Sequence, residues 1–396
     1  MKKYVLVLIL ILTLIFSGVI NASVENDKKM YHTLFNQNEE NIDELFTNDF
    51  LNQVPVSNII QLLNQYKNKL GELKEIENNE EGYRLVFEKG TVPSAISVNS
   101  EQKIAGLWFG NISLSQDDFD SIIKEFKNLD NEISVYVIKN NEEEIIALNE
   151  NEKMGVASTF KIFVLKALHN QIKSTNKDWN DIVRLNEKNK SIPSGILQDW
   201  PINSPITVKT LANLMISQSD NTATDHLIDY IGRENIEKIS GKMNTPFLKT
   251  TEFFKLKHKA DAKIKNEYIN GNTKKKREIL KEISNLNIKA QDVASEPVLI
   301  KEVEWFFSTK QLANTMYDLK EAEALQINPG LANINNWYKV GYKGGSEAGV
   351  LQYTHLLQKN QDSAIFVVSV TANSEKGLDT NKITELTSRL ISILER

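Results

Sequence analysis

The chain has 396 residues, more than one hydrophobic core usually supports, so its length predicts two domains rather than one. Hydrophobic residues make up 41% and charged residues 25%, proportions that exclude a disordered chain. The formal net charge of -5 gives no electrostatic footprint for nucleic acid, and the lack of cysteine excludes disulfides, thiolate metal sites and a lipid on cysteine. We therefore expect no nucleic-acid partner and a nucleophile among the hydroxyls and amines.

The first residues have the pattern of a secretory signal peptide. Two lysines precede an apolar run over residues 4–16, which is followed by small and polar residues. An uncleaved membrane anchor is the alternative, but the run is shorter than the about 20 residues that span a bilayer. We expect cleavage after Ala22, no stable membrane insertion of the mature chain, and a secreted or periplasmic protein.

Residues 27–112 are expected to form a small α+β domain. Apolar residues follow a helical spacing over residues 41–50 and 57–70. The segments that follow alternate or are short and β-branched, as in an antiparallel sheet. These expected strands are residues 74–77, 83–87, 94–98 and 103–109.

The second domain is expected to cover residues 115–396. Its predicted strands are residues 134–138, 145–148, 349–357 and 364–371. Its predicted terminal helices are residues 116–126 and 381–394. An antiparallel sheet flanked by helices is a common α+β arrangement, so both domains belong to the α+β class.

Several Ser-x-x-Lys strings occur, and only their context separates them. Three of these pairs have no distinctive surroundings: Ser100 with Lys103, Ser121 with Lys124, and Ser174 with Lys177. Ser158 instead opens an apolar helix, and Lys161 lies three residues later on the same helical face. Partial burial there lowers the lysine pKa and leaves a neutral amine that can take the serine proton. The first helical turn also offers free backbone N–H groups to an oxyanion.

Two further motifs follow Ser158. Ser219-Asp220-Asn221 alone fits a helix N-cap, and the string over residues 342–347 alone fits a glycine turn before a strand. In this order, however, Ser-x-x-Lys, Ser-Asp-Asn and Lys-x-Gly are the motif set of class A β-lactamases and penicillin-binding proteins. The strings at residues 154–157 and 219–225 also look like class A enzymes. Residues 115–396 therefore resemble this penicillin-recognising family.

The resemblance implies a β-lactamase/transpeptidase-like fold, an antiparallel sheet flanked by helices plus an all-α subdomain. It implies that Ser158 is the acylated nucleophile, that Lys161 is its amine partner, and that Ser219 passes a proton to the leaving nitrogen. The residues it assigns to substrate binding are Asn221, Lys343, Gly345 and Ser346. Lys343 would steer a substrate carboxylate, and the N–H groups of Ser158 and Ser346 would form the oxyanion hole. We expect a small-molecule substrate (β-lactam, ester or cell-wall fragment), a monomer, and no metal or cofactor.

The sequence departs from the family in two places. Gly344 stands where Thr or Ser usually lies between Lys and Gly, and no Glu-x-x-Leu-Asn loop is recognisable. Residues 244–309 are expected to form a longer, basic and helical segment instead. Glu252 and Glu304 are the candidates for the carboxylate that activates the deacylating water, although each also fits a capping or solvated carboxylate. Without the usual loop we expect slow turnover.

Other charged residues have simpler interpretations. The basic run at residues 274–277 fits an exposed helix face, capped by Thr273 and with Ile279, Leu280 and Ile283 packed inward. Binding of anionic cell-wall polymers or lipid headgroups is the less favoured alternative. The histidines at positions 169, 226, 258 and 355 lack metal-ligand spacing.

The N-terminal domain narrows the resemblance. The chain resembles the two-domain serine hydrolases typified by the Orf12 protein of clavulanic acid gene clusters. The resemblance lies in residues 83–89, Val92-Pro93 and residues 104–109, followed by Pro193-Ser194-Gly195. There the first domain is similar to steroid isomerase, NTF2-like and cystatin-like folds, which implies a fold and not an activity. Acyl transfer by Ser158 is the leading hypothesis. A peptidase or esterase is a related alternative, and a binding or sensor protein without turnover is an alternative of another class.

Overall fold

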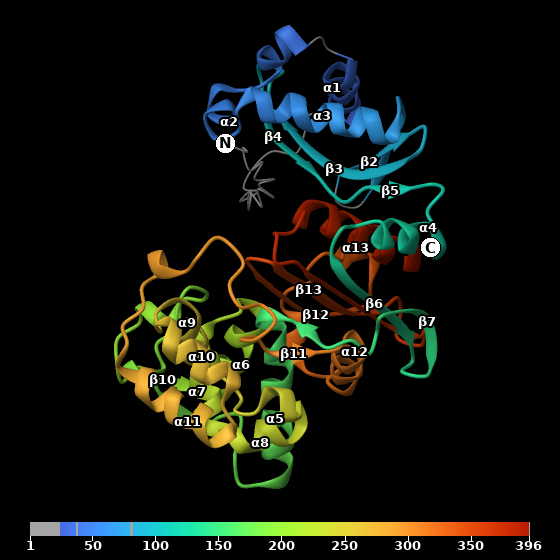
Figure 1. Cartoon of the computed structure of the whole chain (residues 1–396). Coiled ribbons are helices and arrows are strands. Elements are labelled where there is room, and N and C mark those ends of the chain that lie inside the picture. Colours follow the sequence, from blue (N-terminus) through green and yellow to red (C-terminus); the bar gives the residue numbers. More distant parts are fainter. Residues whose placement is uncertain (1–23, 37–38, 80–81, 396) are drawn as a thin grey trace. The chain divides into compact units, whose positions relative to one another are not determined.

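The computed structural model describes residues 24–36, 39–79 and 82–395 (Figure 1). Contacts divide the chain into two compact units. The first ends at Ile123 and also includes Thr384–Leu394, and the second consists of Lys124–Ile383 with Glu395. The predicted signal peptide and its cleavage site at Ala22 lie outside the described residues. Within the described ranges, no helix is both long and apolar enough to cross a membrane.

The first unit packs helices against an antiparallel sheet. Its helices are α1 (Val24–Asn36), α2 (Asn48–Gln53) and α3 (Val56–Leu70). Its strands are β1 (Leu73–Asn79), β2 (Gly82–Phe87), β3 (Gly90–Val98), β4 (Ile104–Phe109) and β5 (Ser113–Leu114). The sheet order is β1-β2-β3-β4, with β5 paired to β3.

The core of this unit lies between the helices and the sheet. Apolar residues at helical spacing, such as Leu34 on α1 and Leu63 on α3, are buried against inward-facing strand residues such as Leu85. Figure 1 shows α1 and α3 beside the strands. The predicted helix at residues 57–70 is confirmed as α3. The prediction of one helix at residues 41–50 was wrong. A 3-10 turn, η1 (Glu39–Leu45), ends at Leu45, and a separate helix, α2, begins after Thr47, whose side chain caps it by accepting the N–H of Phe50.

The second unit is built on an antiparallel sheet with the order β12-β13-β14-β6-β7. Its strands are β6 (Glu132–Lys139), β7 (Glu143–Leu148), β12 (Lys339–Glu347), β13 (Val350–Gln358) and β14 (Ile365–Asn373). Two-residue and three-residue strands pair outside this sheet: β8 (Met154–Gly155) with β11 (Phe306–Phe307), and β9 (Ile182–Arg184) with β10 (Pro205–Thr207). The glycine-rich string over residues 342–347, which taken alone fits a turn, is the end of strand β12.

In the part of the chain that the structure describes, eight α-helices lie wholly within this unit. They are α5 (Lys161–Ser174), α6 (Val208–Ser217), α7 (Asn221–Ile231), α8 (Arg233–Ser240), α9 (Thr250–His258), α10 (Ala262–Asn270), α11 (Thr273–Glu282) and α12 (Thr309–Asp318). Two further helices, α4 (Phe119–Lys127) and α13 (Thr380–Leu394), each have residues in both compact units. Figure 1 shows α5 to α11 gathered in a helical layer beside the sheet. The prediction of an α+β domain is confirmed.

The segment at residues 244–309 is only partly helical. Helices α9, α10 and α11 fill its first part, and the chain then runs through short turns to β11. The inward packing of Ile279, Leu280 and Ile283 is confirmed, since all three are buried. The predicted cap was wrong: Asn272, not Thr273, accepts the N–H of Lys275 and caps α11.

Candidate active site

Ser158 lies in a constrained turn at the start of α5. The 3-10 turn η2 (Ala157–Phe160) leads directly into the α-helix that begins at Lys161. Ala157 has a φ of 43°, a left-handed conformation that costs a residue with a Cβ about 1–3 kcal/mol and persists only where its surroundings hold it. The carboxylate of Glu304 accepts the Ala157 N–H at 3.3 Å. The aromatic ring of Phe160 is buried against Trp305 at 3.8 Å between ring centroids and anchors the other side of the turn.

The amine of Lys161 is fully buried between two serine hydroxyls. Its Nζ lies 3.3 Å from Ser158 Oγ and 3.0 Å from Ser219 Oγ. It also donates to the carbonyl oxygen of Ser219 at 2.6 Å and to Oδ1 of Asn221 at 2.7 Å. The structure therefore brings together four residues that the sequence assigned to the site from two separate segments.

The hydrogen-bond partners of Lys161 can be satisfied by a neutral amine. The Ser219 carbonyl and the Asn221 amide oxygen can only accept, whereas the two hydroxyls can donate or accept. A neutral amine has two N–H donors for the two obligatory acceptors and a lone pair that is free to accept the Ser158 hydroxyl. Burial, followed by the charge of Lys343, holds the pKa of Lys161 well below its usual value.

The Ser219-Asp220-Asn221 turn joins α6 to α7. Ser219 has a φ of 54°, so it is a second left-handed residue at the site. Asp220 is the N-cap of α7 through Ala223 N, and its other oxygen accepts the N–H groups of Ile196 and Leu197 at 2.7 and 3.0 Å. This carboxylate holds the loop that carries Ser194 and Gly195 against the turn, while Ser194 Oγ donates to the Ser219 carbonyl at 2.6 Å.

Strand β12 brings Lys343, Gly345 and Ser346 to the same place. Lys343 Nζ donates to Ser219 Oγ at 3.1 Å, and burial lowers the pKa of this amine to about 7. A Cβ on Gly345 would lie 2.7 Å from Ser158 N and 2.3 Å from Val156 O, so only glycine permits the strand to pass this close to the nucleophile. Ser346 is exposed at the end of the strand.

The profile of the beta-lactamase enzyme family matches residues 115–392. The chain belongs to this family. Solved structures similar to it include a beta-lactamase from Sphaerobacter thermophilus, 18% identical over 69% of this chain and 95% of that chain, with a TM-score of 0.47. An acyl-enzyme complex of a PBP-A mutant with penicillin G is 12% identical over 71% of this chain and 98% of that chain, with a TM-score of 0.46. No curated protein matches.

Among the described residues, no hydrogen bond or ion pair joins Glu252 to Ser158, Lys161 or Ser219. It is the third residue of α9, where its Oε2 accepts the backbone N–H of Lys249 and its Oε1 accepts Arg233 at 2.6 Å. Both side chains are 17% exposed. Its hydrogen bonds are those of a capping carboxylate in an ion pair, and its assignment as a catalytic base stays a prediction.

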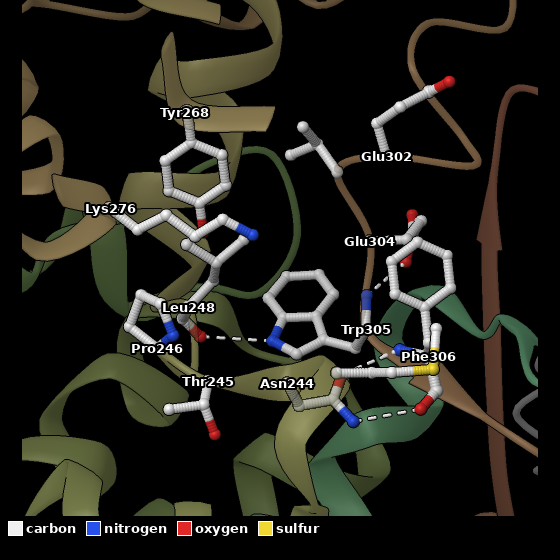
Figure 2. Close-up of a pocket in the computed structure, with 12 residues that line it drawn as sticks. Asn244, Thr245, Pro246, Leu248, Tyr268, Lys276, Glu302, Glu304, Trp305 and Phe306 are labelled. Carbon is white, nitrogen blue, oxygen red and sulfur yellow. Dashed lines mark hydrogen bonds between the residues drawn. The ribbon is translucent and has the colours of Figure 1, made fainter. Parts of the chain in front are cut away.

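Glu304 lies directly behind the nucleophile turn. Its Oε2 accepts Trp305 N at 3.0 Å in addition to Ala157 N, and its side chain is 0% exposed. Figure 2 shows this segment, in which the Trp305 indole donates to the Leu248 carbonyl and the Asn244 amide pairs with the backbone of Phe306. The cavity drawn there has a volume of about 20 Å³, enough for about one water molecule and too small for a substrate.

Three residues that organise this beta-lactamase-family site, Asp225, Lys257 and Glu347, were not predicted from the sequence. Asp225 accepts both the backbone N–H and the hydroxyl of Thr250 and of Thr251, at 2.7 to 2.9 Å. These bonds hold the start of α9 beneath α7. Lys257 and Glu347 form an ion pair that also includes Glu304. The only available signals were the place of Asp225 in the string at residues 219–225 and of Glu347 directly after Ser346. No group of three or more histidine, aspartate or glutamate side chains in the described ranges is arranged to hold a metal ion.

Proposed function

We propose that the protein is a serine hydrolase that acylates Ser158 with β-lactam, ester or amide substrates and releases the acyl group slowly. The observation that carries this proposal is the buried Lys161 amine, whose Nζ lies 3.3 Å from Ser158 Oγ and donates to the Ser219 carbonyl and to the Asn221 amide oxygen. A neutral amine in this position has a lone pair for the Ser158 proton. An amine in this state is a general base for the serine hydroxyl at neutral pH.

The residues of the site then divide the steps of the reaction among them. Lys161 takes the Ser158 proton as Oγ attacks the substrate carbonyl, and the N–H groups of Ser158 and Ser346 bind the oxygen on which negative charge develops. Ser219, which contacts both Lys161 and Lys343, gives its proton to the leaving nitrogen and regains one from Lys161. Water then hydrolyses the acyl-enzyme and restores the Ser158 hydroxyl.

A fluorescent penicillin tests the nucleophile. The wild-type protein should be labelled covalently, and Ser158→Ala should abolish the label because no hydroxyl remains beside Lys161. Ser174→Ala is the matched control: this serine also begins a Ser-x-x-Lys string, but it is exposed and its hydroxyl donates to the Asn170 carbonyl. Labelling of Ser158→Ala at the wild-type level would refute the assignment.

Lys343 is proposed to bind the carboxylate of the substrate. Because burial lowers its pKa to about 7, it is a cation below that pH and loses its charge above it. For a substrate that carries a carboxylate, kcat/KM should therefore fall as the pH rises above about 7, roughly tenfold per unit at most. Lys343→Arg keeps the charge and should flatten this alkaline limb, whatever its effect on the maximal rate. An alkaline limb unchanged in Lys343→Arg would contradict this role.

A penicillin-binding or sensor protein without turnover is the second candidate function. It is favoured by the state of the two glutamates proposed as bases, since Glu252 is paired with Arg233 and Glu304 is fully buried. A base that activates water needs access to that water. Acyl-enzyme lifetime separates the two functions.

The first compact unit is proposed to be an accessory domain of the Orf12 type. Its helices packed on an antiparallel sheet are compatible with an NTF2-like or cystatin-like fold. We place the domain between residues 27 and 112 and the hydrolase domain from residue 115 onward, and we expect a monomer. Such folds serve many functions, so we assign no activity to this domain.

Export is proposed from the N-terminal sequence, with a secreted or periplasmic mature protein that begins at Ser23. N-terminal sequencing of the protein recovered from the culture medium or periplasm should read Ser23-Val24-Glu25. Recovery of a chain that begins at Met1 would favour the uncleaved anchor.

A further inference from the structure

Two carboxyl groups and one ammonium group meet in the interior behind the nucleophile turn. Glu304 comes from the segment before β11, Glu347 from the end of β12, and Lys257 from α9. The side chains of Lys257 and Glu304 are 1% and 0% exposed, and that of Glu347 is 17% exposed. Lys257 Nζ donates to Glu347 and lies 3.6 Å from Glu304 Oε1.

If both carboxyl groups are ionised, one buried oxygen atom of this cluster, Oε1 of Glu304, has no hydrogen-bond donor. The Oε2 atom of Glu304 accepts two backbone N–H groups, but its buried Oε1 atom has no hydrogen-bond donor. A second carboxylate cannot supply one, whereas a protonated Glu347 can. Burial and the adjacent charge of Glu304 raise the pKa of Glu347 well above its usual value, against the opposing effect of Lys257. With one proton, the cluster holds one carboxylate and one ammonium and is neutral.

The cluster joins the two backbone segments that carry the N–H groups of the oxyanion hole. Glu304 binds the N–H of Ala157, the left-handed residue directly before Ser158. Glu347 directly follows Ser346, and β12 contacts the Ser158 turn at Gly345. Lys257, which contacts both carboxyl groups, therefore links the segment before one donor to the segment after the other.

We propose that Glu304 and Glu347 share one proton and that this pair, neutralised by Lys257, fixes the spacing of the Ser158 and Ser346 N–H groups. The role of these N–H groups rests on the proposed function; the shared proton does not. Glu304 and Glu347 are thus positioning residues, since they act through the backbone of the oxyanion hole. This assignment differs from that of Glu304 as the base for deacylation, because loss of a positioning residue slows acylation as well as deacylation, whereas loss of the base slows deacylation alone.

Infrared difference spectroscopy tests the shared proton independently of catalysis. The wild-type protein at pH 7 should show the C=O stretch of a protonated carboxylic acid that is absent from Glu347→Gln. The same band should disappear in Glu304→Gln, because Glu347 ionises against Lys257 once its partner is neutral. Glu302→Gln, an exposed carboxylate two residues away, is the matched control and should keep the band. A band that persists in Glu304→Gln, or is absent from the wild-type protein, overturns the pairing.

Kinetics test the positioning role. Acylation and deacylation both pass through an oxyanion, and one lost donor typically lowers the rate by about a hundredfold or more. Glu304→Leu, which removes the acceptor for Ala157 N, should slow both steps by roughly tenfold to a hundredfold. Glu304→Gln keeps an acceptor and should slow each step less than Glu304→Leu does.

The kinetic outcomes also show whether a failure lies in the positioning role of Glu304 or in the proposed hydrolase function on which that role rests. A longer acyl-enzyme lifetime in Glu304→Gln with unchanged acylation identifies Glu304 as a base and refutes the positioning role. A wild-type protein that shows the shared-proton band but takes no acyl group refutes the proposed function and leaves the pairing intact. Equal rates in Glu304→Leu and Glu302→Gln refute the coupling to the oxyanion hole.

Discussion

Replacement of Lys161 with alanine is expected to slow acylation of Ser158 by about a hundred- to ten-thousandfold, the usual contribution of a positioned general base. The effect should appear in the acylation rate constant measured by stopped flow or quenched flow. Lys166→Ala is the matched control on the same helix, because its amine pairs with Asp318 at the surface. Circular dichroism should verify folding, since Lys161→Ala also leaves the Ser219 carbonyl and the Asn221 amide oxygen without a donor.

The pH dependence distinguishes a base from a structural lysine. Lys161 must be neutral and Lys343 charged in the same active enzyme, and the charge of Lys343 helps to lower the pKa of Lys161. The acidic limb of kcat/KM should therefore report protonation of Lys161 and should be absent in Lys161→Ala. An acidic limb that remains unchanged in this variant, or an acylation rate within a few fold of the wild type, would rule out the lysine as the base.

Hydrolysis of a chromogenic cephalosporin is expected to show a burst of one equivalent per active site, followed by a much slower steady state. Acylation requires only groups that the structure brings together, namely Ser158, Lys161 and Ser219. Deacylation requires a base with access to water, and Glu252 and Glu304 are held in other interactions. The lack of such a base typically slows the step by about a hundredfold or more.

The glutamate variants complete this experiment. Neither Glu252→Gln nor Glu304→Gln should lengthen the acyl-enzyme lifetime selectively if the enzyme lacks a dedicated base. Esters with good leaving groups should be turned over somewhat faster than β-lactams. Rapid steady-state hydrolysis of penicillins without a burst would show that a competent base exists and that the segment at residues 244–309 supplies more than its contacts indicate.

The catalytic motifs could be predicted from the sequence because each depends on local order. The apolar helix after Ser158 distinguishes its Ser-x-x-Lys string from the exposed one at Ser174. The order of the three motifs along the chain indicates the family. Strand β12 was less predictable, because a glycine-rich string taken alone also fits a turn. The close contact of Gly345 with the nucleophile turn explains why glycine occurs inside a strand.

The buried network behind the site could not be predicted from sequence. Lys257 and Glu347 are separated by 90 positions, and nothing in either neighbourhood marks an ion pair. Thr250 and Thr251 resemble ordinary helix-start residues until the fold places the Asp225 carboxylate against them. Glu304 was found as a candidate from its position before three aromatic residues, but its contact with Ala157 is a property of the folded chain.

Time-resolved intact-mass spectrometry with penicillin tests the central claim most directly. We predict that each chain gains the mass of one penicillin within the first turnovers, that peptide mapping places the adduct on Ser158, and that the adduct outlasts the removal of free antibiotic. Ser158→Ala should gain no mass, and Ser174→Ala should behave as the wild type. An adduct on another residue, or no adduct under conditions in which penicillin disappears, would contradict the account.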